Sequence, residues 1–192
     1  KTGERFVDEL ANRKVRADAI MTLLNEGIHC YAVADAKGVE PMGISRPGLL
    51  QKMLERGCVK QYETLEALAA GEKINIEGLR KSVEEWNSAV KSGTDAHFKR
   101  YVNKKAQPMG TGPWYVSPLE PKVHHCMGGI YTDMQARALD ISTDEPIPGL
   151  FAAGEATGGV HGAVRLGSCA VTDCLVYGRI AGRTAAQNES WM

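Results

Sequence analysis

Apolar and polar positions recur with a helical period in the first half of the chain. The clearest pattern lies between Asn75, a good N-cap residue, and Gly93, a residue type that favours the position just past a helix end. Between them, apolar side chains recur at spacings of four, three and four residues: Leu79, Val83, Trp86 and Val90. This pattern predicts an amphipathic helix whose apolar face packs inward.

The segments before this helix read as shorter helices joined by turns, each helix followed by a glycine. The predicted helices cover residues 15–25, 47–56 and 64–70, and the glycines are Gly27, Gly57 and Gly71. A short strand over residues 29–34 interrupts them, because Tyr31 and Val33 are good strand formers.

The pattern changes after residue 105. Residues 106–120 are rich in proline and glycine, which predicts a loop or linker and places a domain boundary there, with domains at 1–120 and 121–192. Short strands over residues 129–132 and 150–153 follow, and then glycine-rich loops and a helix over residues 170–186. A strand, a glycine loop and a helix in that order are typical of nucleotide-binding folds, so we expect an α/β (α+β) fold class.

Composition excludes several classes of partner. Acidic and basic residues balance at 23 each in 192 residues, so the chain offers no basic field for nucleic acid and no polybasic segment for a membrane surface. No apolar run approaches the roughly 18 residues of a membrane span. The 5 cysteines lack CxxC pairs and regular spacing, which predicts free thiols in a reducing compartment such as the cytoplasm or the lumen of an organelle such as the mitochondrion.

The chemistry of the chain is concentrated between His124 and Asp173. Glycines there are dense enough to bring backbone N–H groups close to a ligand, although tight loops without a ligand would also use them. Glu155 follows Gly154 just past a predicted buried strand, where a carboxylate needs a partner. That partner is either a sugar hydroxyl of a nucleotide or a backbone group that the carboxylate caps.

Two cationic side chains in this stretch are candidates for binding an anion. Arg165 has glycines on both sides and no acidic neighbour in sequence, so its guanidinium suits a bidentate grip on a carboxylate or phosphate, unless it is a surface arginine. His125 could face the same ligand or satisfy a local hydrogen bond. We expect no metal site, because a third clustered ligand is lacking.

The start of the last predicted helix is a third candidate. Gly167, Ser168, Cys169, Ala170 and Val171 lie there. A helix N-terminus gathers free N–H groups and partial positive charge, which would stabilise negative charge on a reduced flavin. The alternative is a plain helix start that Ser168 caps.

Four segments resemble the flavin-dependent fumarate reductases, a branch of the succinate dehydrogenase and fumarate reductase flavoprotein superfamily. They are GERFVDELANR at residues 3–13, WNSAVKSGTDAHFKR at 86–100, HHCMGG at 124–129 and IPGLFAAGEATGGVHGAVRLGS at 147–168. The resemblance extends over nearly the whole chain. It departs from the family at Cys126 and Cys169, where threonine and asparagine are common, and we expect altered thiol sensitivity there.

The resemblance implies roles for individual residues. Arg13 matches the arginine that protonates the substrate carbon opposite the hydride, although pairing with Glu9 four residues earlier would be an ordinary structural role. His125 and Arg165 match the pair that binds one substrate carboxylate. Glu155 matches the acid that holds the ribose of FAD, and Gly154 beside it is expected to bind the cofactor as well. Residues 167–171 match the loop at the isoalloxazine ring.

The resemblance also implies a function for the whole protein. Residues 1–120 would be part of a clamp, or capping, domain, and residues 121–192 would complete a Rossmann-like FAD-binding domain. Reduced FAD would pass hydride from N5 to fumarate to give succinate, with electrons from a donor module outside this segment. Urocanate, ketosteroid or aspartate substrates are the alternatives within the superfamily. No GxGxxG turn between a strand and a helix is present, so the isolated chain is expected to be catalytically silent.

Overall fold

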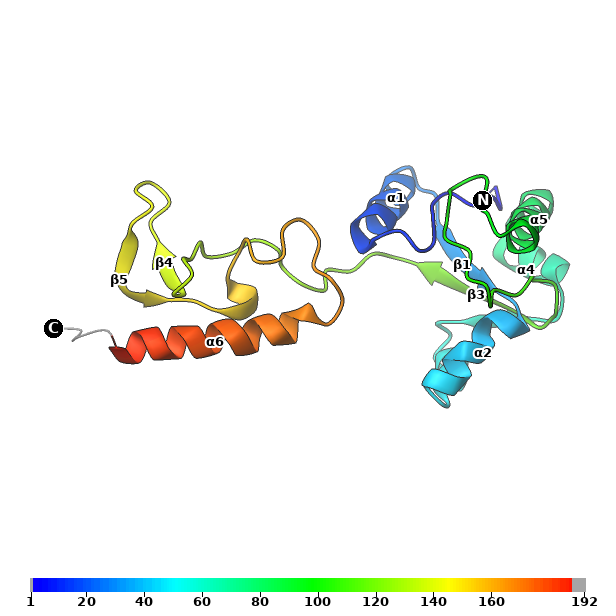
Figure 1. Ribbon diagram of the computed structural model, residues 1–192. Helices are drawn as coiled ribbons and strands as arrows, with labels where there is room; N and C mark the ends of the chain where they lie inside the picture. The colour runs from blue at the N-terminus through cyan, green and yellow to red at the C-terminus, as the bar shows by residue number, and fades with distance from the viewer. Residues whose placement is uncertain (1, 188–192) are drawn as a thin grey trace. The chain divides into compact units, whose positions relative to one another are not determined.

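The computed structural model describes residues 2–187 and divides the chain into two compact units, the first ending at Pro121 and the second beginning at Lys122 (Figure 1). Helices and strands alternate irregularly, which makes the fold a mixed α/β one. Within the described residues, no helix is both long enough and apolar enough to cross a bilayer.

The first unit combines a small sheet with surrounding helices. The helices are α1 (Arg13–Asn25), α2 (Ala36–Ser45), α3 (Leu49–Glu55), α4 (Leu65–Glu72) and α5 (Ile76–Ser92). The strands are β1 (Cys30–Ala34), β2 (Lys60–Tyr62) and β3 (Trp114–Leu119), and they pair antiparallel in the order β1-β3-β2.

The central strand β3 lies where the sequence predicted a loop, so the expectation for residues 106–120 was wrong in this part. Proline is normally excluded from a central strand because it has no N–H to donate. Pro118 is tolerated because β2 pairs only with Trp114–Val116, while Pro118 lies opposite Tyr31 of β1. One side of Pro118 therefore faces no strand.

The core of the first unit lies between β3 and two helices. Trp114 and Val116 alternate with less buried neighbours along β3, as expected for a strand with one covered face. Four buried residues of α4 and α5 pack against them: Leu65, Leu68, Ala69 and Leu79. The amphipathic pattern read from Asn75 is confirmed, since the Asn75 side chain accepts from the Gly78 N–H and Gly93 has φ 74°.

Other elements differ from the sequence-based expectation. Helix α4 continues through Gly71 to Glu72, and Lys73 takes the left-handed position with φ 56° that was expected of Gly71. Helix α2 was not predicted, because Pro41 and two glycines interrupt its sequence. Proline breaks only the bond to the residue four positions earlier, so Asp35, whose side chain accepts from the Gly38 N–H, still starts the helix.

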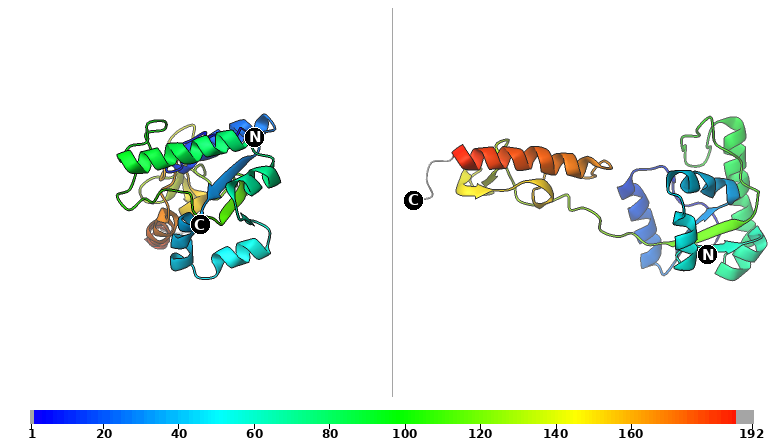
Figure 2. Two further views of the ribbon diagram at one scale, coloured as in Figure 1. Left: turned by 90° about the vertical axis from the view of Figure 1, so that its right-hand side faces the viewer. Right: turned by 90° about the horizontal axis from the view of Figure 1, so that it is seen from below.

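The second unit is built around one long helix. Strands β4 (Arg137–Leu139) and β5 (Pro146–Phe151) pair antiparallel, the short helix η1 (Gly154–Ala156) follows, and α6 (Cys169–Gln187) runs beside β5 and η1 (Figures 1 and 2). The segment 129–132 is not a strand, because it makes only the isolated bridges of Ile130 to Thr157 and of Thr132 to Ala138.

Candidate functional site

The HHCMGG segment, residues 124–129, is fixed against the turn that contains η1. The Ile130 N–H donates to the Ala156 carbonyl at 2.8 Å, and the Gly158 N–H donates to the Ile130 carbonyl at 3.1 Å. A methyl group on Gly129 would collide with the Ala156 carbonyl oxygen. Some of the glycines in this stretch are therefore explained by close contact between two backbone segments.

Glu155 connects the same two segments through its side chain. Its Oε1 accepts from the Cys126 N–H at 2.9 Å, and its Oε2 lies 3.3 Å from Nδ1 of His125. The hydrogen bond from the Cys126 N–H, together with the charges of His125 and Arg165, lowers the pKa of Glu155. The expected backbone cap is thus observed, and the side chain is still 55% exposed, so its remaining lone pairs can accept from a ligand.

His125 is buried and contacts a second histidine. Its side chain is 4% exposed, and its ring meets the ring of His161 edge-to-face, with centroids 5.3 Å apart and an interplanar angle of 72°. Nε2 of His161 lies 3.2 Å from Oδ2 of Asp173 in α6. Sequence reasoning did not single out His161 or Asp173. The available signal was a histidine inside the glycine loop and an acid among the apolar residues of α6.

Arg165 is buried, so the alternative of a surface arginine is wrong. It is 7% exposed, and its Nη1 donates to the Leu166 carbonyl at 3.1 Å. Its Nε is buried and has no hydrogen-bond partner within residues 2–187. A buried guanidinium with an unused donor suits an anionic ligand, because an unpaired buried charge is costly.

The start of α6 lies one residue earlier than predicted. The helix begins at Cys169, whose N–H donates to the Leu166 carbonyl at 3.3 Å. Ser168 has φ 68°, a left-handed conformation that is uncommon for a residue with a side chain. Ala170 and Val171 lie in the first turn, where backbone N–H groups have no partner within the helix.

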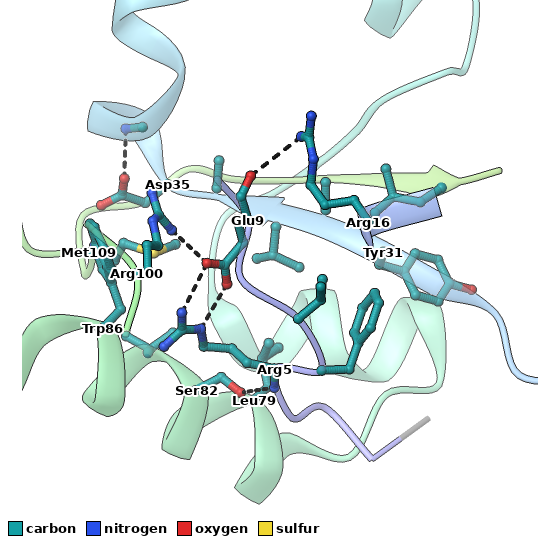
Figure 3. A pocket seen from close by; sticks show the side chains of 18 of the residues that line it. Arg5, Glu9, Arg16, Tyr31, Asp35, Leu79, Ser82, Trp86, Arg100 and Met109 are labelled. Carbon is teal, nitrogen blue, oxygen red and sulfur yellow. Dashed lines mark hydrogen bonds and ion pairs between the residues drawn. The ribbon is translucent and has the colours of Figure 1, made fainter. Parts of the chain in front are cut away.

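Arg13 lies in the first unit, as the first residue of α1, and Asn12 caps this helix by accepting from the Val15 N–H at 3.0 Å. Arg13 does not pair with Glu9, so the alternative of an ordinary structural pair is not observed. Glu9 is instead held by two other arginines, Arg5 at 2.8 and 2.9 Å and Arg100 at 2.8 Å (Figure 3).

These arginines border a cavity of about 820 Å³, which Arg13 and Arg16 also line. Its walls are largely apolar and include Ile20 and Val83. Tyr31, Leu79 and Trp86 also line it (Figure 3). Arg5 is 9% exposed and also donates to Asp95 at 2.6 Å. Although burial lowers the pKa of Arg5, the hydrogen bonds to Glu9 and Asp95 raise it overall, so the guanidinium stays charged.

Comparison with known proteins gives a consistent assignment. The FAD binding domain family matches residues 1–171. A probable fumarate reductase of Shewanella frigidimarina is 38% identical over 98% of the chain, and a urocanate reductase of Eggerthella lenta is 37% identical over 97% of it. The chain covers 30% of each of these two relatives, so it spans about a third of their length or less.

Solved structures show the same relationship. The open conformation of a flavocytochrome c3 fumarate reductase matches 97% of the chain with a TM-score of 0.66 and 35% identity, and the chain covers 31% of that structure. A 3-ketosteroid Δ1-dehydrogenase of Sterolibacterium denitrificans matches 97% of the chain with a TM-score of 0.75 and 26% identity, with 38% of that structure covered. The chain therefore belongs to the FAD-binding domain family of flavoproteins, in the branch that contains flavin-dependent fumarate reductases.

Proposed function

We propose that the whole protein reduces fumarate to succinate with FAD. The observation that carries this proposal is the buried guanidinium of Arg165, which has an unused donor and lies in the same unit as His125, an imidazole held by Glu155. Buried cations of this kind favour a small anionic substrate. The likeness to a probable fumarate reductase supports the choice of fumarate.

The residues of the second unit fit the cofactor of the family. Glu155 keeps free lone pairs for the ribose hydroxyls, and Gly154, with φ 70°, lets the backbone turn sharply beside it. The loop of residues 167–171 presents helix N–H groups that suit the electron-rich edge of a flavin. When bound, FAD supplies the hydride for the reduction of the alkene.

His125 and Arg165 would bind one carboxylate of the substrate. Nδ1 of His125 lies 3.3 Å from Oε2 of Glu155, which leaves Nε2 as the ring nitrogen that can donate to the substrate. Arg165 adds N–H donors whose planar arrangement matches the two oxygens of a carboxylate. Together they would stabilise the negative charge that develops beside the alkene carbon as hydride is added.

Arg13 would protonate the other alkene carbon. Within residues 2–187 it forms no ion pair, so no carboxylate holds its guanidinium away from a substrate. A guanidinium is protonated at all ordinary pH values, so the transfer must be concerted with its reprotonation through a relay. In this proposal residues 1–120 form part of the clamp domain, and an electron-donor module lies outside the chain.

A second candidate is the reduction or dehydrogenation of a bulkier alkene. The cavity of about 820 Å³ beside Arg13 is largely apolar and larger than a four-carbon dicarboxylate requires. The fold likeness to a 3-ketosteroid Δ1-dehydrogenase also supports a bulkier substrate. We favour fumarate because buried cations, unlike apolar walls, select for carboxylates.

The test is steady-state kinetics of the full-length, FAD-loaded protein with a reduced dye as the electron donor. Fumarate, urocanate, acrylate and a ketosteroid are compared as substrates by kcat/KM. We expect fumarate to be preferred and Arg165→Ala to lower kcat/KM about a hundredfold or more. Arg137→Ala is the matched control, because Arg137 pairs with Asp133 at 2.6 Å in the same unit and has no proposed role. Preference for another alkene would reject the fumarate assignment. Equal effects of the two variants would reject the proposed role of Arg165 in binding the substrate.

A further inference from the structure

The second unit contains two histidine–carboxylate pairs whose imidazole rings contact each other. His125 faces Glu155 with 3.3 Å between Nδ1 and Oε2, and His161 faces Asp173 with 3.2 Å between Nε2 and Oδ2. The two imidazoles contact each other edge-to-face at 5.3 Å. Only the first of these pairs has a part in the proposed function.

The two pairs differ in burial. Glu155 is 55% exposed, so this carboxylate is accessible to solvent or to a ligand. Asp173 is 3% exposed and the His161 side chain 12% exposed. Asp173 is also the residue that α6 buries, while Leu175 of the same helix is 69% exposed. The second pair therefore has a buried carboxylate, whereas the first has an exposed one.

Asp173 has few groups with which to pair. Its Oδ1 is buried without a hydrogen-bond partner in residues 2–187, and its contact with His161 is at ion-pair distance without the angle of a hydrogen bond. Among residues 2–187, His161 is the basic side chain that lies within ion-pair distance of this buried carboxylate. The cost of an unpaired buried charge ties the position of the His161 ring to that of Asp173.

Since imidazole edges carry partial positive charge and faces partial negative charge, an edge-to-face contact fixes the angle between two rings. With Nδ1 within 3.3 Å of Glu155 and the ring plane at 72° to that of His161, both contacts together define the direction of Nε2 of His125. Nε2 is the nitrogen that remains for a substrate carboxylate. We propose that His161, held by Asp173, is a positioning residue that sets the orientation of His125 for carboxylate binding, an inference that rests on the role proposed above for His125.

The test uses the full-length, FAD-loaded protein and fumarate as substrate. The variants are His161→Gln, Asp173→Asn, His125→Gln and the double variant of His125 and His161. We expect His161→Gln and Asp173→Asn each to lower kcat/KM about tenfold, chiefly through KM, as for other partners that orient a ligand-binding histidine. Because Asp173→Asn keeps the size of the side chain, it carries the test if His161→Gln fails to fold.

The decisive measurement is the double variant. If His161 acts through His125, then His161→Gln in the His125→Gln background should change kcat/KM less than twofold. Fully additive losses would overturn the proposal, because they indicate separate, merely structural effects. If His125→Gln alone leaves kcat/KM unchanged, the proposed role of His125 fails instead, and the two failures are thereby distinguished.

A matched control is available in the first unit. His97 and Glu85 form a histidine–carboxylate pair at 3.4 Å in which the His97 side chain is 53% exposed. Glu85→Gln should leave KM and kcat unchanged. The FAD content of each variant is measured by absorbance, and an Asp173→Asn protein with full FAD content and an unchanged KM would also overturn the proposal.

Discussion

The most quantitative stability prediction concerns Asp95 in the first unit. Asp95 is 2% exposed, accepts from Nη2 of Arg5 at 2.6 Å, and its Oδ1 accepts from the backbone N–H groups of His97 and Phe98. In Asp95→Asn the amide oxygen can still cap these two N–H groups, so the change replaces the charged Oδ2 acceptor that faces Arg5 with an uncharged NH2 donor. Breaking a buried ion pair costs about 3–5 kcal/mol. Because Arg5 keeps Glu9 as a partner, we expect a loss of about 2–3 kcal/mol.

Urea unfolding of the 192-residue chain, followed by tryptophan fluorescence, measures this loss of stability. Two of the three tryptophans, Trp86 and Trp114, lie in the first unit. A loss of about 2–3 kcal/mol lowers the urea concentration at the midpoint of unfolding by about 1 M, when the unfolding free energy falls with urea at the usual rate. The control is Asp18→Asn, which breaks the exposed pair of Lys14 and Asp18 and should cost less than about 0.5 kcal/mol. Equal midpoints for the two variants would refute the reasoning.

The same variant has a predicted pH dependence. Arg5 lowers the pKa of Asp95, and the backbone N–H groups of Phe98 and His97 lower it further. A lowered pKa in the folded state gives stability that is present above the unfolded pKa of about 4 and is lost as the pH falls through the folded pKa. The difference between the wild-type chain and Asp95→Asn should therefore be full at pH 7 and shrink below about pH 4. A constant difference down to pH 2 would contradict the assignment.

Three further predictions follow from single sites. Gly129→Ala should destabilise the second unit by about 2–3 kcal/mol in thermal unfolding, because its methyl group meets the Ala156 carbonyl, and a neutral effect would refute this contact. Lys73→Gly should stabilise the chain to urea by about 0.5–1 kcal/mol, because Lys73 has the left-handed φ of 56° that glycine adopts more easily. A lower stability of this variant would contradict the prediction. Burial raises the pKa of Cys30, whereas Cys58 is exposed, so maleimide at pH 8 should label Cys58 before Cys30, as followed by mass spectrometry. Equal labelling would contradict this order.

Local signals predicted the helix in which the cap, the apolar spacing and the final glycine agree. The Asn75 cap, the apolar spacing and Gly93 together defined α5, because all three depend on residues close in sequence. Strand β3 was missed because its central position depends on pairing with β1 and β2, which lie far away along the chain. Proline and glycine content describes local preference and contains no information on such partners.

In the candidate site, too, local features were predicted and contacts between distant segments were not. The residues singled out between Gly154 and Arg165 do include a buried cation and a carboxylate that contacts His125. The pairing of His161 with Asp173 could not be read from the sequence, because it depends on how the glycine loop packs against α6. The alternative pairing of Arg13 with Glu9, which spacing along a helix suggested, is not observed, and Arg100, a partner of Glu9, is distant in sequence.

The central claim is that His125 and Arg165 bind a carboxylate of the substrate. The most direct measurement is a crystal structure of the full-length protein with FAD and fumarate bound. We predict that one carboxylate lies within hydrogen-bond distance, roughly 2.7–3.2 Å, of both Nε2 of His125 and the guanidinium of Arg165. A fumarate bound with both carboxylates away from these two side chains would contradict the account.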